Sequence, residues 1–342
     1  MSKLSGVYGL ALGVAGFAGL LTSPVAAAAT LDDVRERDRL VCGVSEGLPG
    51  FSDHDDAGAW SGFDVDFCRA VAAAVLGEAD KVDYVPLSAT ARFDALTAGD
   101  IDLLSRNSTW TMSRDLDLGI DFAGIAYYDG QGFLVQALDG MTSALELIGA
   151  RICLVTGTTT EANAANYFAS NNIEVSFLPF ADRSEARAAY AAGECDAYTA
   201  DSSALAAERS LLDVPDDHVI LREVISKEPL GPVTREGDTQ WTELVRWTLY
   251  GLINAEEMGL TAASVDPDRG DGASRDQAIA LGAPAAMKLG LNEAWLATVL
   301  NEVGHYGEVF DRNLGDDTPL AIRRGVNALW TRGGILYAPP MY

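Results

Sequence analysis

The stretch "LTAGDIDLLSRNS" (96–108) has a counterpart later in the chain, "YAAGECDAYTADS" (190–202). Each copy closes a helix with Ala-Gly, passes through an acidic residue and x-Asp into a short strand, and ends in polar residues. Gly99 and Gly193 suit the left-handed residue that ends many helices. The recurrence predicts two units of the same kind, each with polar side chains where a strand ends.

A second pair of segments points the same way. "LVCGVSEG" (40–47) resembles "RICLVTGT" (151–158), and both read as a strand that runs into a polar loop. Chance similarity in an alanine-rich chain is the alternative. Two aligned junctions between a strand and a polar loop favour the repeat.

Strand and helix signals alternate around these segments. "RLVCGV" (39–44) and "KVDYVPL" (81–87) read as strands, and "GFDVDFCRAVAAAVLG" (62–77) reads as a helix with Asp64 as its N-cap. This alternation predicts an α/β fold in which helices cover parallel sheets. Ligands of such folds bind at the carboxyl ends of the strands, where the strand order switches direction.

The length of 342 residues exceeds one typical core, so two compact units are expected. We expect a first lobe over 30–131, a second lobe inserted over 132–228, and a return to the first lobe with a C-terminal extension over 229–342. Two crossings would join the lobes, "GQGFLVQ" (130–136) and "EPLGPVTREGD" (228–238). Their glycines and prolines mark positions where a few backbone torsions could absorb domain closure.

The first 29 residues read as a secretory signal peptide. Lys3 precedes a short apolar run over 7–21, and the small residues Ala26 and Ala28 suit cleavage near Ala28 or Ala29. A membrane anchor is the alternative, but glycines interrupt the run and it is shorter than the about 20 residues that a spanning helix needs. We therefore expect export to the periplasm without a membrane anchor.

Composition and motifs exclude several functions. The formal net charge of −26 makes nucleic acid an improbable partner. P-loop, HExxH and GxGxxG motifs are absent, and the three histidines, His54, His218 and His305, are isolated. The sequence therefore predicts neither an enzyme nor a metal or cofactor site, and a binding module is the better class.

Four cysteines, Cys42, Cys68, Cys153 and Cys195, lack the spacing of a zinc site. After export they could form disulfides, and three pairings are open. Because two cysteines fall in each expected lobe, the pairs 42–68 and 153–195 are preferred. Four buried free thiols are the alternative.

A carboxylate site is suggested by "TGTTTEANAANYFA" (156–169), which reads as a loop that enters a helix. Thr158 as N-cap and Glu161 form a capping-box pattern, and the N–H groups of such a first turn favour an anion. A simple helix cap is the alternative. Arg114 could hold the same carboxylate in a bidentate fork beside the hydroxyl of Thr109, with Arg106 as a competitor.

A negative charge is expected at the end of the strand in the second repeated segment. Asp201 could accept an ammonium, or it could cap the helix that begins "SSALAAER". An amino acid carries one carboxylate and one ammonium. The two strand ends therefore predict the two halves of a clamp for a small zwitterion.

The sequence also resembles the periplasmic general L-amino-acid-binding proteins of ABC importers, within the polar amino-acid solute-binding proteins. The resemblance covers nearly the whole mature chain. It is carried by "GFDVDFCRAVAAAV", "RFDALTAGDIDLLSRNSTWTMSRDLDLG", "GTTTEANAANYF" and "GECDAYTADSSALAAER", and by "VGHYGEVF" and "LWTRGGILYAPP" in the C-terminal extension. It implies a type II periplasmic-binding-protein fold, with two Rossmann-like lobes that close on a ligand. The closed form would dock on the permease transmembrane subunits, and a monomer is expected.

The resemblance also assigns ligand contacts. Arg114 and Thr109 would bind the α-carboxylate with the backbone around Gly157, Thr158 and Thr159, and Asp201 would bind the α-ammonium. Asn107 and Ser108 would line the same strand end. Relatives specific for basic ligands carry an acid where this chain has Ser45, with Glu46 adjacent, which implies broad specificity. Trp60 and Trp110 could flank the pocket or belong to the core.

Two other functions stay open at this point. Cyclohexadienyl dehydratase-like enzymes resemble this fold and use the cleft for catalysis, for which Glu46 is the one candidate acid in the first loop. A chemosensory protein that presents its ligand to a receptor is the other alternative.

Overall fold

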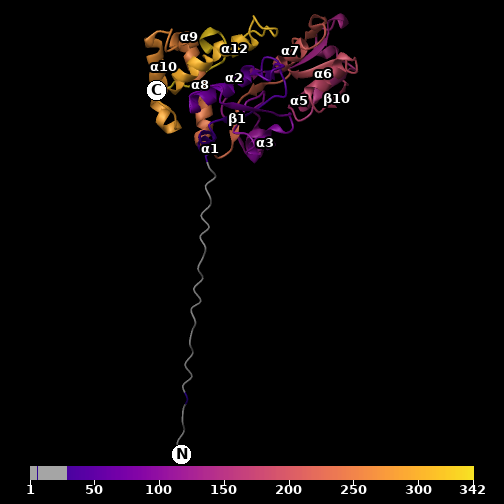
Figure 1. The fold of residues 1–342 in the computed structure, drawn as a ribbon. Coiled ribbons are helices and arrows are strands. Elements are labelled where there is room, and N and C mark those ends of the chain that lie inside the picture. Colours follow the sequence, from indigo (N-terminus) through magenta and orange to yellow (C-terminus); the bar gives the residue numbers. More distant parts are fainter. Residues whose placement is uncertain (1–5, 7–28) are drawn as a thin grey trace, which may run out of the picture.

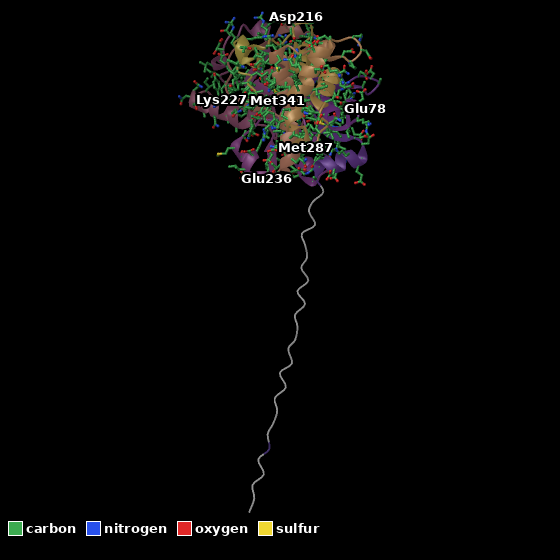
Figure 2. The ribbon with its side chains drawn as sticks, turned by 90° about the vertical axis from the view of Figure 1, so that its left-hand side faces the viewer. Glu78, Asp216, Lys227, Glu236, Met287 and Met341 are labelled. Atoms are coloured by element: carbon green, nitrogen blue, oxygen red, sulfur yellow. A yellow bond between two sulfur atoms is a disulfide. The ribbon has the colours of Figure 1, made fainter. Side chains whose placement is uncertain are left out.

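The computed structural model describes residue 6 and residues 29–342. The predicted signal peptide therefore lies outside the described residues, apart from Gly6 and Ala29. Within the part that is described, no helix is both long and apolar enough to cross a membrane. Exposed acids such as Glu78, Asp216 and Glu236 lie at the edge of the molecule in Figure 2, as the negative charge of the chain leads one to expect.

The first sheet has five strands, in the order β4-β1-β5-β14-β6. β1 is parallel to β4 and β5, whereas β14 is antiparallel to both of its neighbours. The strands are β1 (Leu40–Val44), β4 (Val82–Pro86), β5 (Leu103–Leu104), β6 (Ile120–Phe122) and β14 (Val233–Arg235). The helices next to it in sequence are α1 (Thr30–Arg37), α2 (Phe63–Leu76), α3 (Arg92–Ala98) and α4 (Met112–Asp117), and a hairpin of β2 (Asp53–His54) and β3 (Trp60–Ser61) precedes α2.

The second sheet repeats this plan in the order β10-β9-β11-β8-β12. β9 is parallel to β10 and β11, and β8 is antiparallel to β11. The strands are β8 (Gln131–Gln136), β9 (Arg151–Val155), β10 (Ser176–Phe180), β11 (Ala197–Asp201) and β12 (His218–Ile220), and the helices are α5 (Thr160–Ser170), α6 (Arg183–Ala191) and α7 (Ser202–Ser210). The repeated segments end in β5 and β11, which are the third strands of their sheets, so the predicted bilobed α/β fold is confirmed. The exact lobe boundaries stay a prediction.

Each lobe contains one cysteine pair. Cys42 of β1 is bonded to Cys68 of α2, and Cys153 of β9 is bonded to Cys195 just before β11. All four side chains are buried. These are the two pairs that the sequence favoured. Each disulfide links a strand of the sheet to another segment of the same lobe, so neither disulfide connects the two lobes.

The start of α2 corrects one prediction. Its N-cap is Gly62, with a φ of +132°, and the helix begins at Phe63. A Cβ at Gly62 would lie 2.2 Å from the carbonyl oxygen of Phe51, so only glycine fits there. Asp64 is therefore a buried residue of the first turn and not the N-cap.

Two antiparallel strands, β7 (Tyr127–Asp129) and β13 (Glu228–Leu230), lead the chain out of the first lobe and back. A residue far along the chain also bonds to this crossing. The side-chain amide of Asn327 donates to the carbonyl oxygen of Tyr128 at 2.9 Å and accepts from its N–H at 2.7 Å. Asn327 thus bonds to β7 as a neighbouring strand would.

The C-terminal extension packs on the first lobe, at the end of the molecule opposite to α5, α6 and β10 (Figure 1). Its helices are α8 (Thr239–Met258), α9 (Ala262–Val265), α10 (Gly272–Leu289), α11 (Trp295–Val303) and α12 (Tyr306–Leu314). Trp241 and Trp295 are buried in the same core as α2. The first lobe therefore has the larger core, and the second lobe projects from it on the two crossings.

Candidate functional site

The ends of the parallel strands of both sheets meet at one cleft, which contains two adjoining cavities. The small cavity measures about 20 Å³ and the large one about 390 Å³. Val155, Thr158 and Arg183 line both cavities. The cleft is therefore continuous, with a tight end and a wide end.

The small cavity gathers most of the residues predicted for the zwitterion. Its lining includes Asn107, Thr109 and Arg114 from the first lobe and Thr158, Thr159 and Asp201 from the second. Arg114 Nη1 donates to the carbonyl oxygen of Thr109 at 2.9 Å, and its guanidinium lies over the ring of Phe93 at 5.3 Å. These contacts fix the guanidinium while it still lines the cavity. Burial lowers the pKa of Arg114.

The loop before α5 differs by one residue from the prediction. The N-cap is Thr159, whereas Thr158 had been expected. The hydroxyl of Thr158 donates to the carbonyl oxygen of Val155 at 2.8 Å and accepts from the N–H of Thr160 at 3.3 Å. The loop is thus held against β9, and the start of α5 stays at the small cavity.

Asp201 ends β11 and occupies the N-cap position of α7. Among the described residues, its carboxylate makes no capping hydrogen bond to that helix and instead lines the small cavity. Burial raises its pKa well above the usual value, and the negative charges of Asp129 and Glu228 raise it further. A ligand ammonium would reverse this shift by supplying the missing positive charge.

Glu228 is a buried carboxylate at the return crossing that sequence reasoning did not assign. Its Oε2 accepts from the hydroxyls of Thr109 at 2.6 Å and Thr159 at 3.0 Å. Its Oε1 accepts from Asn163 at 2.7 Å and Ser226 at 2.6 Å. Because Thr109 and Thr159 come from different lobes, Glu228 connects both lobes through hydrogen bonds beside the small cavity.

Ser45 and Glu46, predicted to contact the variable part of the ligand, line the large cavity. Ser45 is buried, and its hydroxyl accepts from Arg106 Nη2 at 3.2 Å and from Arg183 Nη1 at 3.0 Å. Arg106 belongs to the first lobe and Arg183 to the second. Glu46 is exposed at the rim. Arg106, the proposed competitor of Arg114, thus lies at the other end of the cleft.

Besides Arg187, four arginines line the cleft of this acidic protein: Arg92, Arg106, Arg114 and Arg183. Within the described part of the chain, none of the four forms an ion pair with a carboxylate. Burial, together with the positive charge of Arg183, lowers the pKa of Arg106 to about 9. Burial also lowers the pKa of Arg92 well below its usual value. Such a cluster favours an anionic ligand.

Four residues that were expected to line or flank the site lie outside the linings of both cavities. Trp60, on β3, packs its ring 5.7 Å from Tyr84 and 5.0 Å from His54. Ser108 is fully buried behind Asn107 and Thr109. Gly157 contacts the opposite lobe, since its carbonyl oxygen accepts from Arg92 Nη2 at 3.4 Å and a Cβ there would lie 2.7 Å from Thr90. Trp110, which was expected to flank the pocket together with Trp60 or to belong to the core, stacks on Phe122.

Arg92 and Arg183 are the cations that sequence reasoning missed. They follow β4 and β10, the edge strands of the parallel part of each sheet, and β10 ends only three residues before Arg183. The strand-end rule that selected Thr109 and Asp201 applies to these strands as well. The segments after the edge strands, and not only those after the repeated strands, therefore supply cations to the cleft.

Ser45 also stands in a G-x-S-x-G pattern, Gly43–Gly47, which sequence reasoning overlooked. In hydrolases with this pattern a neighbouring base activates the serine. Among the described residues, the side-chain groups that bond to Ser45 Oγ are two guanidiniums, and neither is a base. The same part of the chain contains no cluster of His, Cys, Asp or Glu suited to a metal ion.

Comparisons with known proteins agree with this architecture. The family model of the bacterial extracellular solute-binding proteins, family 3, matches residues 40–261. The general L-amino acid-binding periplasmic protein of Rhizobium johnstonii is 52% identical over 92% of this chain and 94% of its own length. The glutamate/glutamine/aspartate/asparagine-binding protein of Rhodobacter capsulatus is 48% identical over 94% of this chain and 95% of its own.

A solved structure is similar over nearly the whole described fold. It is an ABC transporter periplasmic binding protein from Brucella ovis with glutathione bound, and it is 50% identical with a TM-score of 0.89. The match covers 92% of this chain and 100% of that one, so it includes much of the C-terminal extension that lies beyond the family model. The chain therefore belongs to family 3 of the bacterial extracellular solute-binding proteins.

Proposed function

We propose that this protein captures L-amino acids in the periplasm and delivers them to the transmembrane subunits of an ABC transporter. The observation that carries the proposal is the small cavity, where Arg114 of one lobe and Asp201 of the other line the same space. An α-amino acid presents a carboxylate and an ammonium on one carbon. A cation and an anion from opposite lobes can bind both groups only when the lobes are together, which links binding to closure.

In the proposed pose, the α-carboxylate lies between Arg114 and the start of α5, and the α-ammonium lies at Asp201. Charge-assisted hydrogen bonds of this kind are about twice as strong as neutral ones. Thr109 contributes less directly than the sequence suggested, because its hydroxyl already donates to Glu228. Its carbonyl oxygen instead orients Arg114.

Broad specificity is supported by the wide end of the cleft. The side chain of a ligand held in the small cavity would extend into the 390 Å³ cavity, which is of the size that takes ligands larger than one small side chain. The relatives named above bind general L-amino acids or glutamate, glutamine, aspartate and asparagine, and the Brucella protein holds glutathione. We extend this range, from small amino acids to γ-glutamyl compounds, to the present chain.

In this proposal the protein binds and carries its ligand and does not change it chemically. Export would depend on the predicted signal peptide over 1–29, with cleavage near Ala28 or Ala29. The mature form would work as a monomer that docks on the permease when closed. Its relatives are periplasmic binding proteins, which supports this location.

Calorimetry on protein freed of carried-over ligand by unfolding and refolding tests the proposal. The twenty amino acids would be titrated singly, with the corresponding D-enantiomers as controls. Several L-amino acids should bind with one site per chain, and the D-forms should bind more weakly because both α-groups and the side chain cannot then fit together. Failure of every L-amino acid to bind would contradict the proposed function.

A further inference from the structure

We propose that Arg183 and Arg106 form a second anion site at the wide end of the cleft, which binds a carboxylate at the far end of the ligand's side chain. This inference rests on the proposed function and specifies one ligand class within its range, amino acids with an anionic side chain. It assigns the discrimination among ligands chiefly to Arg183.

The geometry shows an acceptor shared by two cations. Arg106 Nη2 and Arg183 Nη1 both donate to the hydroxyl of Ser45, at 3.2 and 3.0 Å. Arg106 Nη1 donates to the carbonyl oxygen of Ser88 at 2.9 Å, and its Nε has no hydrogen-bond partner among the described residues. A neutral hydroxyl thus faces two positive charges, which a carboxylate would balance far better.

The acids around this site have other partners or lie at its edge. Asp182 Oδ1 accepts from the N–H of Glu185 at 2.9 Å and caps α6, and Asp53 accepts from the N–H of His54 at 2.9 Å. Glu46 is exposed at the rim. Asp64 lies near Arg106, but burial raises its pKa to about 7, which weakens it as a counter-ion near neutral pH.

A third arginine of the large cavity differs in this respect. Arg187 Nη1 is bonded to the buried carboxylate of Glu208 at 2.7 Å. Its charge is therefore already balanced by a residue of its own lobe. Of the cations that line the large cavity, Arg106 and Arg183 are those without a carboxylate partner in the described residues.

The position of Arg183 also suits a ligand that spans the cleft. Arg183 lines both cavities, so it lies beside the junction through which the side chain of a bound amino acid would pass. Ala89, Val155 and Leu211 give the wide end apolar surface for methylene groups. A distal carboxylate would therefore bind Arg106 of the first lobe and Arg183 of the second, and it would stabilise the closed form.

The test compares Arg183→Gln with wild type, because Arg183 is only half-buried and its loss threatens folding less than that of Arg106. Arg222→Gln is the matched control, since it removes one exposed charge from the same lobe. Aspartate, glutamate, 2-aminoadipate and glutamine would be titrated into each protein. Thermal melts without ligand would verify that each variant folds.

Glutamate affinity should fall about 30-fold or more in Arg183→Gln, as expected when one partner of a desolvated charge pair is removed. Glutamine affinity should change less than about threefold, and Arg222→Gln should bind all four ligands like wild type. Equal losses for glutamate and glutamine would overturn the second anion site and leave the proposed function intact. A wild-type protein that binds no amino acid would instead refute the proposed function.

Discussion

The two ends of the cleft differ in how firmly they are held. At the narrow end, Arg114 is oriented by Thr109 and Glu228 accepts four hydrogen bonds, two of them from opposite lobes. At the wide end, two guanidiniums donate to the hydroxyl of Ser45, and all three side chains line a cavity of about 390 Å³. The narrow end thus suits the α-groups that every amino acid shares, and the wide end suits the part that varies. The contacts common to all ligands and the contacts that differ between ligands therefore lie at opposite ends of the cleft.

The largest effect expected from this comparison concerns the narrow end. Arg114→Ala should weaken all amino-acid ligands alike, by about 2 to 5 kcal/mol, because it removes the cation that meets the shared carboxylate. Titrations with glutamate, glutamine, leucine and arginine would measure it. Arg114→Lys is the control, since it keeps the charge and should recover part of the affinity. If only one of the four ligands lost affinity, Arg114 would not be the common contact of the α-carboxylate, and the two ends of the cleft would not differ in the way described.

A smaller effect of pH should also belong to the narrow end. Asp201 must be ionised to hold an ammonium, and its pKa is raised by burial and by Asp129 and Glu228. Affinity for every ligand should therefore fall as the pH drops through this raised pKa, by up to about tenfold per pH unit. Calorimetry at a series of pH values on both sides of neutrality would follow it.

Two variants sharpen the pH experiment. Asp201→Asn should bind weakly and lose the pH dependence. Asp129→Asn removes a negative charge that raises the pKa of Asp201, so its affinity should persist to lower pH than in wild type. An unchanged profile in Asp201→Asn would assign the ammonium to another carboxylate.

The smallest effect is expected at the wide end. Glu46→Gln removes an exposed negative charge at the rim, so glutamate should bind more tightly by roughly two- to fivefold, and leucine should not change. Competition titrations at low salt would detect this difference, and 1 M salt should abolish it. A loss of leucine binding would show that Glu46 contributes to the shape of the pocket and not only to its charge.

More of the residues that line the narrow end than of those that line the wide end could be named from the sequence, for a physical reason. Thr109 follows β5 and Asp201 ends β11, the two repeated strands, and both residues carry groups suited to the zwitterion that the repeat suggested. Arg183 and Arg92 follow the edge strands, and Glu228 lies on the return crossing, where the backbone signals indicated a hinge but not a buried carboxylate. The place of Trp60 was left open between pocket and core, because its partners, His54 and Tyr84, are brought together only by tertiary packing.

Asn327 makes one part of the crossing between the lobes, β7, stiffer than the segments that follow it. β7 bonds to β13 and also to this side chain of the C-terminal extension, so the torsions of Tyr128 cannot change without breaking hydrogen bonds. Bending should then concentrate on the second-lobe side of this strand, near Gly130 and, on the return segment, near Lys227. The axis of closure would thus lie near the second lobe. The second lobe, which is the smaller part, would rotate, and the first lobe and the extension would move together as one rigid body.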